Sequence, residues 1–141
     1  MSEEIDATPL GDCRGCRFRM SLLLMGRCLP GDTCVQVQSG RQIDRFFFFN
    51  PQFSVDFLQD AFWERRAIAV RYAPAERLTV LINDADEAVR RAVAYRLPRE
   101  QLVALMNDPD REVRITVADR LPLPLLESMA TDSDYLVRNY V

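Results

Sequence analysis

The chain lacks lysine and histidine, so its 18 basic residues are all arginine. These two absences exclude lysine-based covalent catalysis and histidine acid–base or metal chemistry, and with them most hydrolase and transferase mechanisms. No acid–base pair, phosphate-binding loop or open metal-site motif appears in the sequence. We therefore expect a protein that is not an enzyme. Cysteine is the only strong transition-metal ligand left, and the chain has four.

Long apolar runs are also missing. The longest, Met20 to Gly26, is far too short to cross a bilayer, and no small-residue cleavage site follows it. The chain has 141 residues, 48% hydrophobic and 28% charged, with a net charge of −3, which fits one folded domain and indicates no nucleic-acid partner. We expect a cytoplasmic protein, and in that reducing compartment closely spaced cysteines more often bind metal than form disulfides.

Glycine is scarce, and its five copies all lie in the window from Gly11 to Gly40 that also holds every cysteine. Glycine permits turns with positive φ, which wrap backbone around a small centre. We expect Gly15 to permit a first tight turn, and Pro30 with Gly31 to form a second. The window therefore predicts an irregular metal-binding segment whose ligands are Cys13, Cys16, Cys28 and Cys34.

Two metal centres suit four thiolates, namely a single zinc ion and a 4Fe-4S cluster. Zinc ligands usually pair two to four residues apart, so the five residues between Cys28 and Cys34 fit zinc poorly. A cluster is larger and tolerates uneven gaps, which favours iron–sulfur and leaves zinc as the alternative. Four flanking arginines would offset the negative charge of either centre, and so do not discriminate: Arg14, Arg17, Arg19 and Arg27.

The rest of the chain repeats itself every 24 residues. Residues 83–106 (NDADEAVRRAVAYRLPREQLVALM) align in register with residues 107–130 (NDPDREVRITVADRLPLPLLESMA), and weaker copies extend the register in both directions. Such a period is typical of a solenoid, whose units bury their apolar faces only by stacking. We expect two helices in each repeat and no strand. The first starts after an N-cap at Asp84, Asp108 or Asp132, and the second, α or 3₁₀, starts at Pro74, Pro98 or Pro122.

Aromatic residues concentrate where the cysteine window meets the repeats. Residues 42–62 carry seven of the eight phenylalanines, and the run Phe46 to Phe49 is not amphipathic at either period, so we expect both of its sides to be covered. The favoured interpretation is a cap that seals the first repeat; an aromatic electron relay or an exposed docking patch is the alternative. We divide the chain into a cysteine-rich segment with its aromatic cap, residues 1–50, and a repeat solenoid, residues 51–141. Residues 1–10 form a loose lead-in.

Charged residues recur with the repeats. Asp86 and Arg90 lie four apart on the predicted first helix, as do the equivalent residues of the next two repeats, which predicts pairs within one helix on a solvated face that ties neighbouring repeats together. The sharper alternative is a row of arginines that binds an acidic partner protein. Its members are Arg66, Arg90, Arg114 and Arg138, with Arg96 and Arg120 in a shorter second row.

The C-terminal end is the second candidate contact surface. No proline turn or polar outer layer follows Tyr135, Leu136, Tyr140 and Val141. A solenoid end normally needs a polar cap, so this short helix is either the cap itself or a surface that docks a second copy or another protein.

The cysteine window and the repeats together resemble one known family. Repeats of the form D-x-D-x-x-V-R-x-x-V-A-x-R-L-P, clearest in DPDREVRITVADRLP, follow a four-cysteine segment as in the leucine-rich repeat variant iron–sulfur proteins. The resemblance covers residues 13–141. It implies that Cys13, Cys16, Cys28 and Cys34 hold a 4Fe-4S cluster, that each repeat pairs an α-helix with a 3₁₀ helix in a right-handed superhelix, and that the protein is associated with bacterial nitrogen-fixation gene clusters.

These observations predict an all-α helical repeat solenoid with an irregular, cysteine-rich N-terminal segment. We expect a non-catalytic protein-interaction and redox module that binds a 4Fe-4S cluster. The alternatives are a small electron carrier and a scaffold stabilised by zinc on four cysteines.

Overall fold

The computed structural model describes residues 8–141, so most of the predicted lead-in lies outside the described residues. Within residues 8–141 every regular element is a helix, and an isolated bridge between Leu29 and Thr33 is the sole β-type pairing. The prediction of an all-α repeat solenoid is confirmed. Its α-helices are α1 (Gly40–Phe49), α2 (Trp63–Tyr72), α3 (Glu87–Arg96), α4 (Arg111–Arg120), α5 (Leu123–Leu126) and α6 (Tyr135–Arg138).

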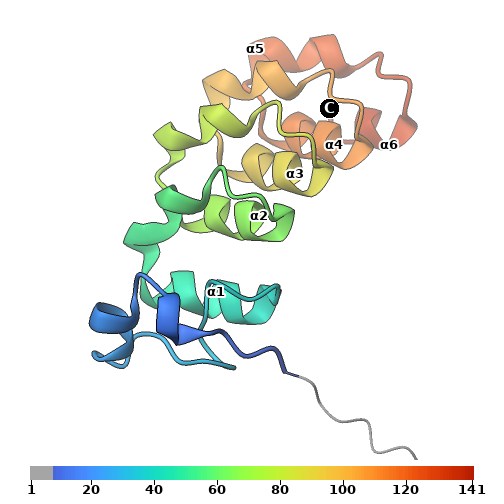
Figure 1. The fold of residues 1–141 in the computed structure, drawn as a ribbon. Helices are drawn as coiled ribbons and strands as arrows, with labels where there is room; N and C mark the ends of the chain where they lie inside the picture. The colour runs from blue at the N-terminus through green and yellow to red at the C-terminus, as the bar shows by residue number, and fades with distance from the viewer. Residues whose placement is uncertain (1–7) are drawn as a thin grey trace, which may run out of the picture.

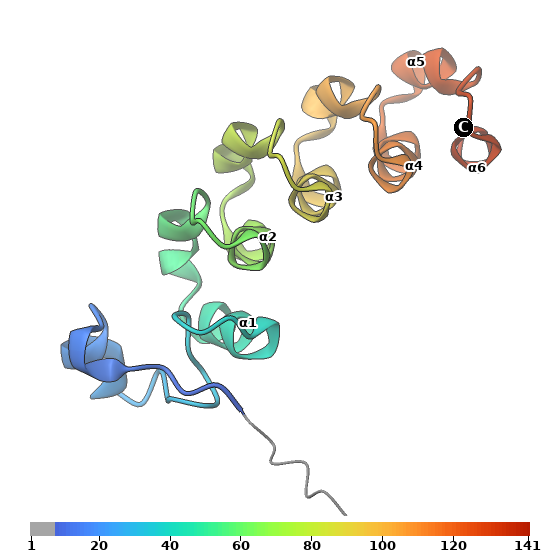
Figure 2. The ribbon, with the colours of Figure 1, turned by 45° about the vertical axis from the view of Figure 1, so that its right-hand side comes forward.

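The helices form two layers along a curve. Helices α1, α2, α3, α4 and α6 follow its inner side, and the second helices of the repeats follow its outer side (Figures 1 and 2). Each turn from the first helix of a repeat to the second falls at a proline, because the residue before a proline avoids the α conformation; Leu97, for example, has ψ 139° before Pro98. The second helices are 3₁₀ at Pro51–Phe57, Ala75–Leu81 and Arg99–Leu105, while α5 continues into the 3₁₀ turn Glu127–Met129.

One hydrophobic core runs between the two layers. Val89, Val93 and Leu97 of one repeat are fully buried, and Leu102 meets them from the outer layer. Burial of each such side chain contributes about 1.5 to 3 kcal/mol relative to exposure. The same core reaches from Phe18 in the cysteine-rich segment to Val137 in α6, so the segment and the repeats share it. No helix within residues 8–141 has the length and apolar character needed to cross a bilayer.

The start of each first helix corrects the predicted N-caps. The caps are Asp86, Asp110 and Asp134, two residues after the predicted ones; the Asp86 carboxylate, for example, accepts a hydrogen bond from the Ala88 N–H at 2.8 Å. Glu87 and Arg111 are therefore the first residues of α3 and α4. The sequence offers two aspartates in each loop, and only the second immediately precedes the helix.

The phenylalanine run also differs from its prediction. Phe46 and Phe47 are buried, whereas Phe48 and Phe49 are 67% and 43% exposed. Helix α1 is therefore amphipathic, and the expectation that both sides of this run are covered is wrong. Its buried side packs on α2, as the predicted cap requires.

Candidate metal centre

The four cysteine side chains line one small cavity, of about 20 Å³, in the N-terminal segment. Cys13 and Cys16 lie at the two ends of the 3₁₀ turn Cys13–Gly15, and Cys28 and Cys34 flank a second turn. Phe18 and Phe46 close the cavity on the core side. None of the four cysteines is in a disulfide, and each is half-buried. The structure therefore brings all four predicted ligands together.

Glycine shapes the second turn but not the first. Gly31 has φ 81°, and a Cβ added there would lie 2.8 Å from the Leu10 side chain. This positive φ is the left-handed conformation that glycine adopts readily. The tight turn predicted at Gly15 is present, but Gly15 does not have a positive φ and a Cβ there would meet open space, so this turn does not require glycine. At Gly11 the backbone passes so close to Cys34 that an added Cβ would lie 2.6 Å from its Sγ.

Two buried amides, Gln42 in α1 and Asn50 immediately after it, hold the cysteine-bearing loops. The Gln42 side-chain amide donates to the Pro9 carbonyl at 2.8 Å, while the Gln42 carbonyl accepts from the Cys34 N–H at 3.2 Å. The Asn50 side-chain amide donates to the Arg27 carbonyl, beside Cys28, at 2.9 Å. Both side chains are fully buried. Helix α1 therefore fixes the backbone next to two of the four thiols.

A third anchor, Arg65 of α2, was missed by the sequence analysis. Its Nε donates to the Val35 carbonyl at 2.6 Å and its Nη2 to the Gln36 carbonyl at 2.9 Å, and the side chain is paired with Asp60. The side chain thus binds the backbone directly after Cys34 and is 9% exposed as a residue. The repeat register could have identified this residue. The equivalent residues 24, 48 and 72 positions later are buried valines, so an arginine at this position is expected to be buried and to need polar partners such as backbone carbonyls.

Burial and mutual repulsion disfavour ionised thiols in this cavity. The pKa of Cys28 is raised to about 11 by burial and by the sulfurs of Cys16, Cys13 and Cys34. The pKa of Cys13 is also raised, by burial first, although the charge of Arg19 lowers it in part. A bound metal reverses this balance, because a coordinating thiol loses its proton.

The flanking arginines differ in what they contact. Arg14 pairs with Asp12, Arg17 pairs with Asp56 and stacks on the Phe18 ring, and Arg27 donates to the Phe49 carbonyl. The charge of Arg19 lowers the pKa of Cys13 in part, against the larger effect of burial. Compensation of a bound centre's charge by the four arginines stays a prediction.

The donor set, four thiols in one cavity, is one that both a zinc ion and an iron–sulfur cluster accept. A tetrahedral zinc ion needs four sulfurs about 2.3 Å from one point. Within residues 8–141 no three Cys, Asp or Glu side chains are grouped closely enough to hold one metal ion. Four thiols around a shared cavity, with no carboxylate in its lining, match the ligands of an iron–sulfur cluster.

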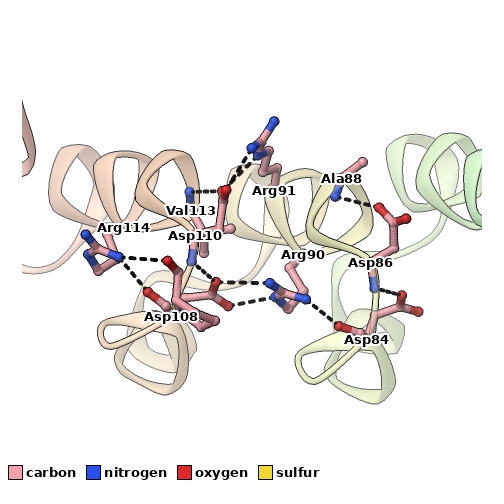
Figure 3. A network of polar contacts seen from close by, with 10 residues as sticks. Asp84, Asp86, Ala88, Arg90, Arg91, Asp108, Asp110, Val113 and Arg114 are labelled. Carbon is pink, nitrogen blue, oxygen red and sulfur yellow. Dashed lines mark hydrogen bonds and ion pairs between the residues drawn. The ribbon is translucent and has the colours of Figure 1, made fainter.

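A second set of polar side chains links the repeats (Figure 3). Arg90 donates to both carboxylate oxygens of Asp108 in the next repeat, and Asp108 also accepts from the Asp110 N–H at 2.9 Å. The pairs Arg66–Asp84 and Arg114–Asp132 repeat this contact at 2.9 and 3.0 Å. The predicted pairs four residues apart, such as Asp86 with Arg90, are wrong, because the arginine reaches across the repeat boundary to a nearly buried carboxylate.

This arrangement bears on the predicted arginine row. The side chains of Arg66, Arg90 and Arg114 are 13% to 15% exposed and bind aspartates within the protein. Their donors are thus mostly occupied, and contact with an acidic partner through them stays a prediction. Arg138 is exposed and donates to the Asp132 carbonyl. In the shorter row, Arg96 and Arg120 donate to carbonyls at or near the end of the preceding α-helix.

The C-terminal side chains are largely exposed. Tyr135, Tyr140 and Val141 are 61%, 51% and 42% exposed, Leu136 is half-buried, and Val137 completes the core. Their predicted role as a contact surface stays a prediction.

Comparison with protein families matches both parts of the chain. Residues 10–56 match the family described as LRV protein FeS4 cluster, and residues 87–110 and 111–134 match the leucine rich repeat variant. The first match contains all four cysteines and the whole of α1. The other two coincide with two successive 24-residue units, whose boundary falls immediately before α4.

Two known proteins are similar to the chain. A solved structure described as a leucine-rich repeat variant with a novel repetitive protein structural motif is 75% identical, with a TM-score of 0.93, over 95% of this chain. An uncharacterized 27.7 kDa protein in the nifB 3' region of Rhodobacter capsulatus is 41% identical over 86 residues, which is 61% of this chain. The match spans 57% of the solved chain and 35% of the Rhodobacter protein.

Proposed function

Because this chain belongs to the leucine-rich repeat variant iron–sulfur proteins, we propose that it binds a 4Fe-4S cluster and acts as a non-catalytic protein-interaction and redox module. The observation that carries the proposal is the convergence of Cys13, Cys16, Cys28 and Cys34 on one cavity. When bound, the cluster supplies one-electron chemistry at a potential that its surroundings tune. The repeats supply a rigid curved surface for a partner.

The protein's own groups hold and shield the site. The four thiolates are the cluster ligands, and Gln42, Asn50 and Arg65 fix the backbone that carries two of them. Phe18 and Phe46 exclude water on the core side, whereas the half-buried cysteines leave the opposite side close to solvent. This partial exposure favours electron carrier as the second candidate function, since transfer to another protein needs a centre near the surface.

The proposal extends to location and biological context. We place the protein in the cytoplasm, where four free thiols stay reduced. A link to nitrogen fixation is supported by the Rhodobacter relative, whose name assigns it to the nifB 3' region.

Anaerobic reconstitution tests the proposal. Protein incubated with ferrous iron and sulfide should become brown and hold about four iron and about four sulfide per chain, and the colour should bleach on reduction. Cys28→Ser should hold much less iron, and Ser128→Ala, far from the cavity, should behave as the unchanged protein. Colourless protein with one bound zinc per chain would contradict the proposal and support the zinc-stabilised scaffold.

A further inference from the structure

The inner face of the repeat curve carries a cavity that the cluster does not explain. Its volume is about 630 Å³, and it lies between the start of α1 and the exposed faces of α2 and α3. This volume is within the range of ligand-binding sites. Six side chains form its rim: Trp63, Tyr95, Arg41, Arg71, Arg91 and Arg96. A neighbouring cavity of about 660 Å³ shares Arg91 and Tyr95 with it and continues towards α4 and α6.

The repeat register separates scaffold residues from the residues of this face. The aspartates and arginines that join the repeats recur at every step, and the core valines recur from α3 onward. Three residues of the groove that these two cavities form do not recur: Trp63 lies in the slot of Glu87, Tyr95 in the slot of Asp119, and Arg91 in the slot of Ile115. Packing of the solenoid therefore does not require them, and they gather at one place on its surface.

Charge varies along the groove. The cavity at α1 to α3 has four arginines and one carboxylate, Glu64, in its lining, although the whole chain has a net charge of −3. The cavity towards α6 has three carboxylates and two arginines. An occupant that follows the groove thus meets a basic end first and a mildly acidic end afterwards.

Two arginines at the basic end keep most of their donors free for an occupant. Arg41 is exposed and makes one hydrogen bond, of 3.3 Å, to the Gly31 carbonyl. Arg71 has a side chain that is 62% exposed and makes one ion pair, of 3.6 Å, with Asp44. A guanidinium has five N–H donors, which suit a carboxylate. Trp63 and Tyr95, which line the same cavity and are 42% and 68% exposed, offer aromatic faces.

We propose that this groove binds an extended acidic segment of a partner protein. Carboxylates of the segment pair with Arg41 and Arg71, an apolar side chain packs on Trp63 and Tyr95, and basic residues that follow lie over Asp110 and Asp134. The continuity of the two cavities favours a chain over a compact small molecule. The carboxylates at the far end disfavour a nucleic acid, whose phosphates they would repel. The proposal rests on the interaction role proposed above and names its surface.

Trp63 makes the test direct, because it is the only tryptophan in the chain. The reconstituted protein is titrated with blocked decapeptides that lack aromatic residues, contain two leucines and end in two lysines. The peptides carry zero, two or four glutamates. Trp63 emission should change saturably, and affinity should rise about tenfold or more from zero to four glutamates, as expected for charge-assisted hydrogen bonds. The double variant Arg41→Gln, Arg71→Gln should lose that gain.

A control variant outside the groove tests whether the effect is specific to Arg41 and Arg71. Arg77→Gln, an exposed arginine on the outer layer, should bind as the unchanged protein does. No saturable response, an affinity independent of glutamate number, or equal competition by inorganic phosphate would each overturn the proposal. Cluster absorbance is recorded in the same samples. A peptide response without a cluster would count against the cluster proposal only, and a cluster without a peptide response would count against this one only.

Discussion

Arg90 joins the loops at both ends of its own repeat. Its Nη1 donates to the Asp84 carbonyl at 2.7 Å, and its Nε donates to the Asp108 carboxylate in the next repeat at 2.8 Å (Figure 3). The Arg90 and Asp108 side chains are 13% and 5% exposed. Because the same contact recurs between the other repeats, these pairs set how each unit sits on its neighbour.

The first prediction concerns the two aspartates of one loop. Asp108→Ala leaves the nearly buried Arg90 without its carboxylate, so the free energy of unfolding should fall by about 3 kcal/mol or more. Asp110→Ala removes an N-cap and a pair with the more exposed Arg91, and should cost about 1 kcal/mol. Urea unfolding measures both losses. Equal losses, or a larger one for Asp110, would show that the pair between repeats does not dominate.

The second prediction concerns acid. Hydrogen bonds from Arg91 lower the pKa of Asp110 below its ordinary value of 3.8, with the Val113 N–H adding to the effect. A carboxyl whose native pKa is lowered stabilises the fold above its unfolded pKa, and this stabilisation is lost as pH falls through the native pKa. Unfolding free energy should therefore drop from about pH 4 downward. Asp110→Asn should flatten that drop, whereas Asp119→Asn, an exposed carboxyl on α4, should leave it unchanged.

The fold could be predicted from the sequence because the 24-residue alignment shows which positions of successive repeats are equivalent. Val89 and Val113 occupy one slot and share one buried position, and Pro98 and Pro122 share one turn. Equivalence between repeats places such residues without knowledge of distant contacts. The same equivalence cannot tell within which repeat Arg90 finds its partner, because Asp86 and Asp108 both recur every 24 residues.

The cysteine site was predictable in its ligands but not in its supports. Four cysteines in one window can be recognised as metal ligands from the sequence, because thiolates bind transition metals. Gln42 and Asn50 carry no such signal, since their role arises only when the fold buries them against loop carbonyls. Phe48 was mispredicted for a different reason. In a run of four identical apolar residues the sequence does not show which side of the helix is buried, and Phe48 is exposed because the packing of α1 buries the other side.

A third prediction compares two glycines of the cysteine segment. Gly31→Ala places a side chain at φ 81° and against Leu10, so it should strain the turn between Cys28 and Cys34. We expect reconstituted protein to lose its cluster several times faster under air. Gly15→Ala, where a Cβ meets open space, should not accelerate the loss. Matching rates for both variants would place the sensitivity of the site elsewhere.

The last prediction concerns Arg65, which ties α2 to the backbone after Cys34. Arg65→Lys keeps the charge but loses the planar fork that contacts the Val35 and Gln36 carbonyls together. Because these carbonyls lie next to a cluster ligand, we expect faster cluster release to an iron chelator as well as a lower unfolding midpoint. Arg77→Lys, on the exposed outer layer, is the matched control. A lower midpoint with unchanged cluster release, measured at a temperature where both proteins are folded, would mean that Arg65 supports the solenoid alone and does not position the cysteine loop.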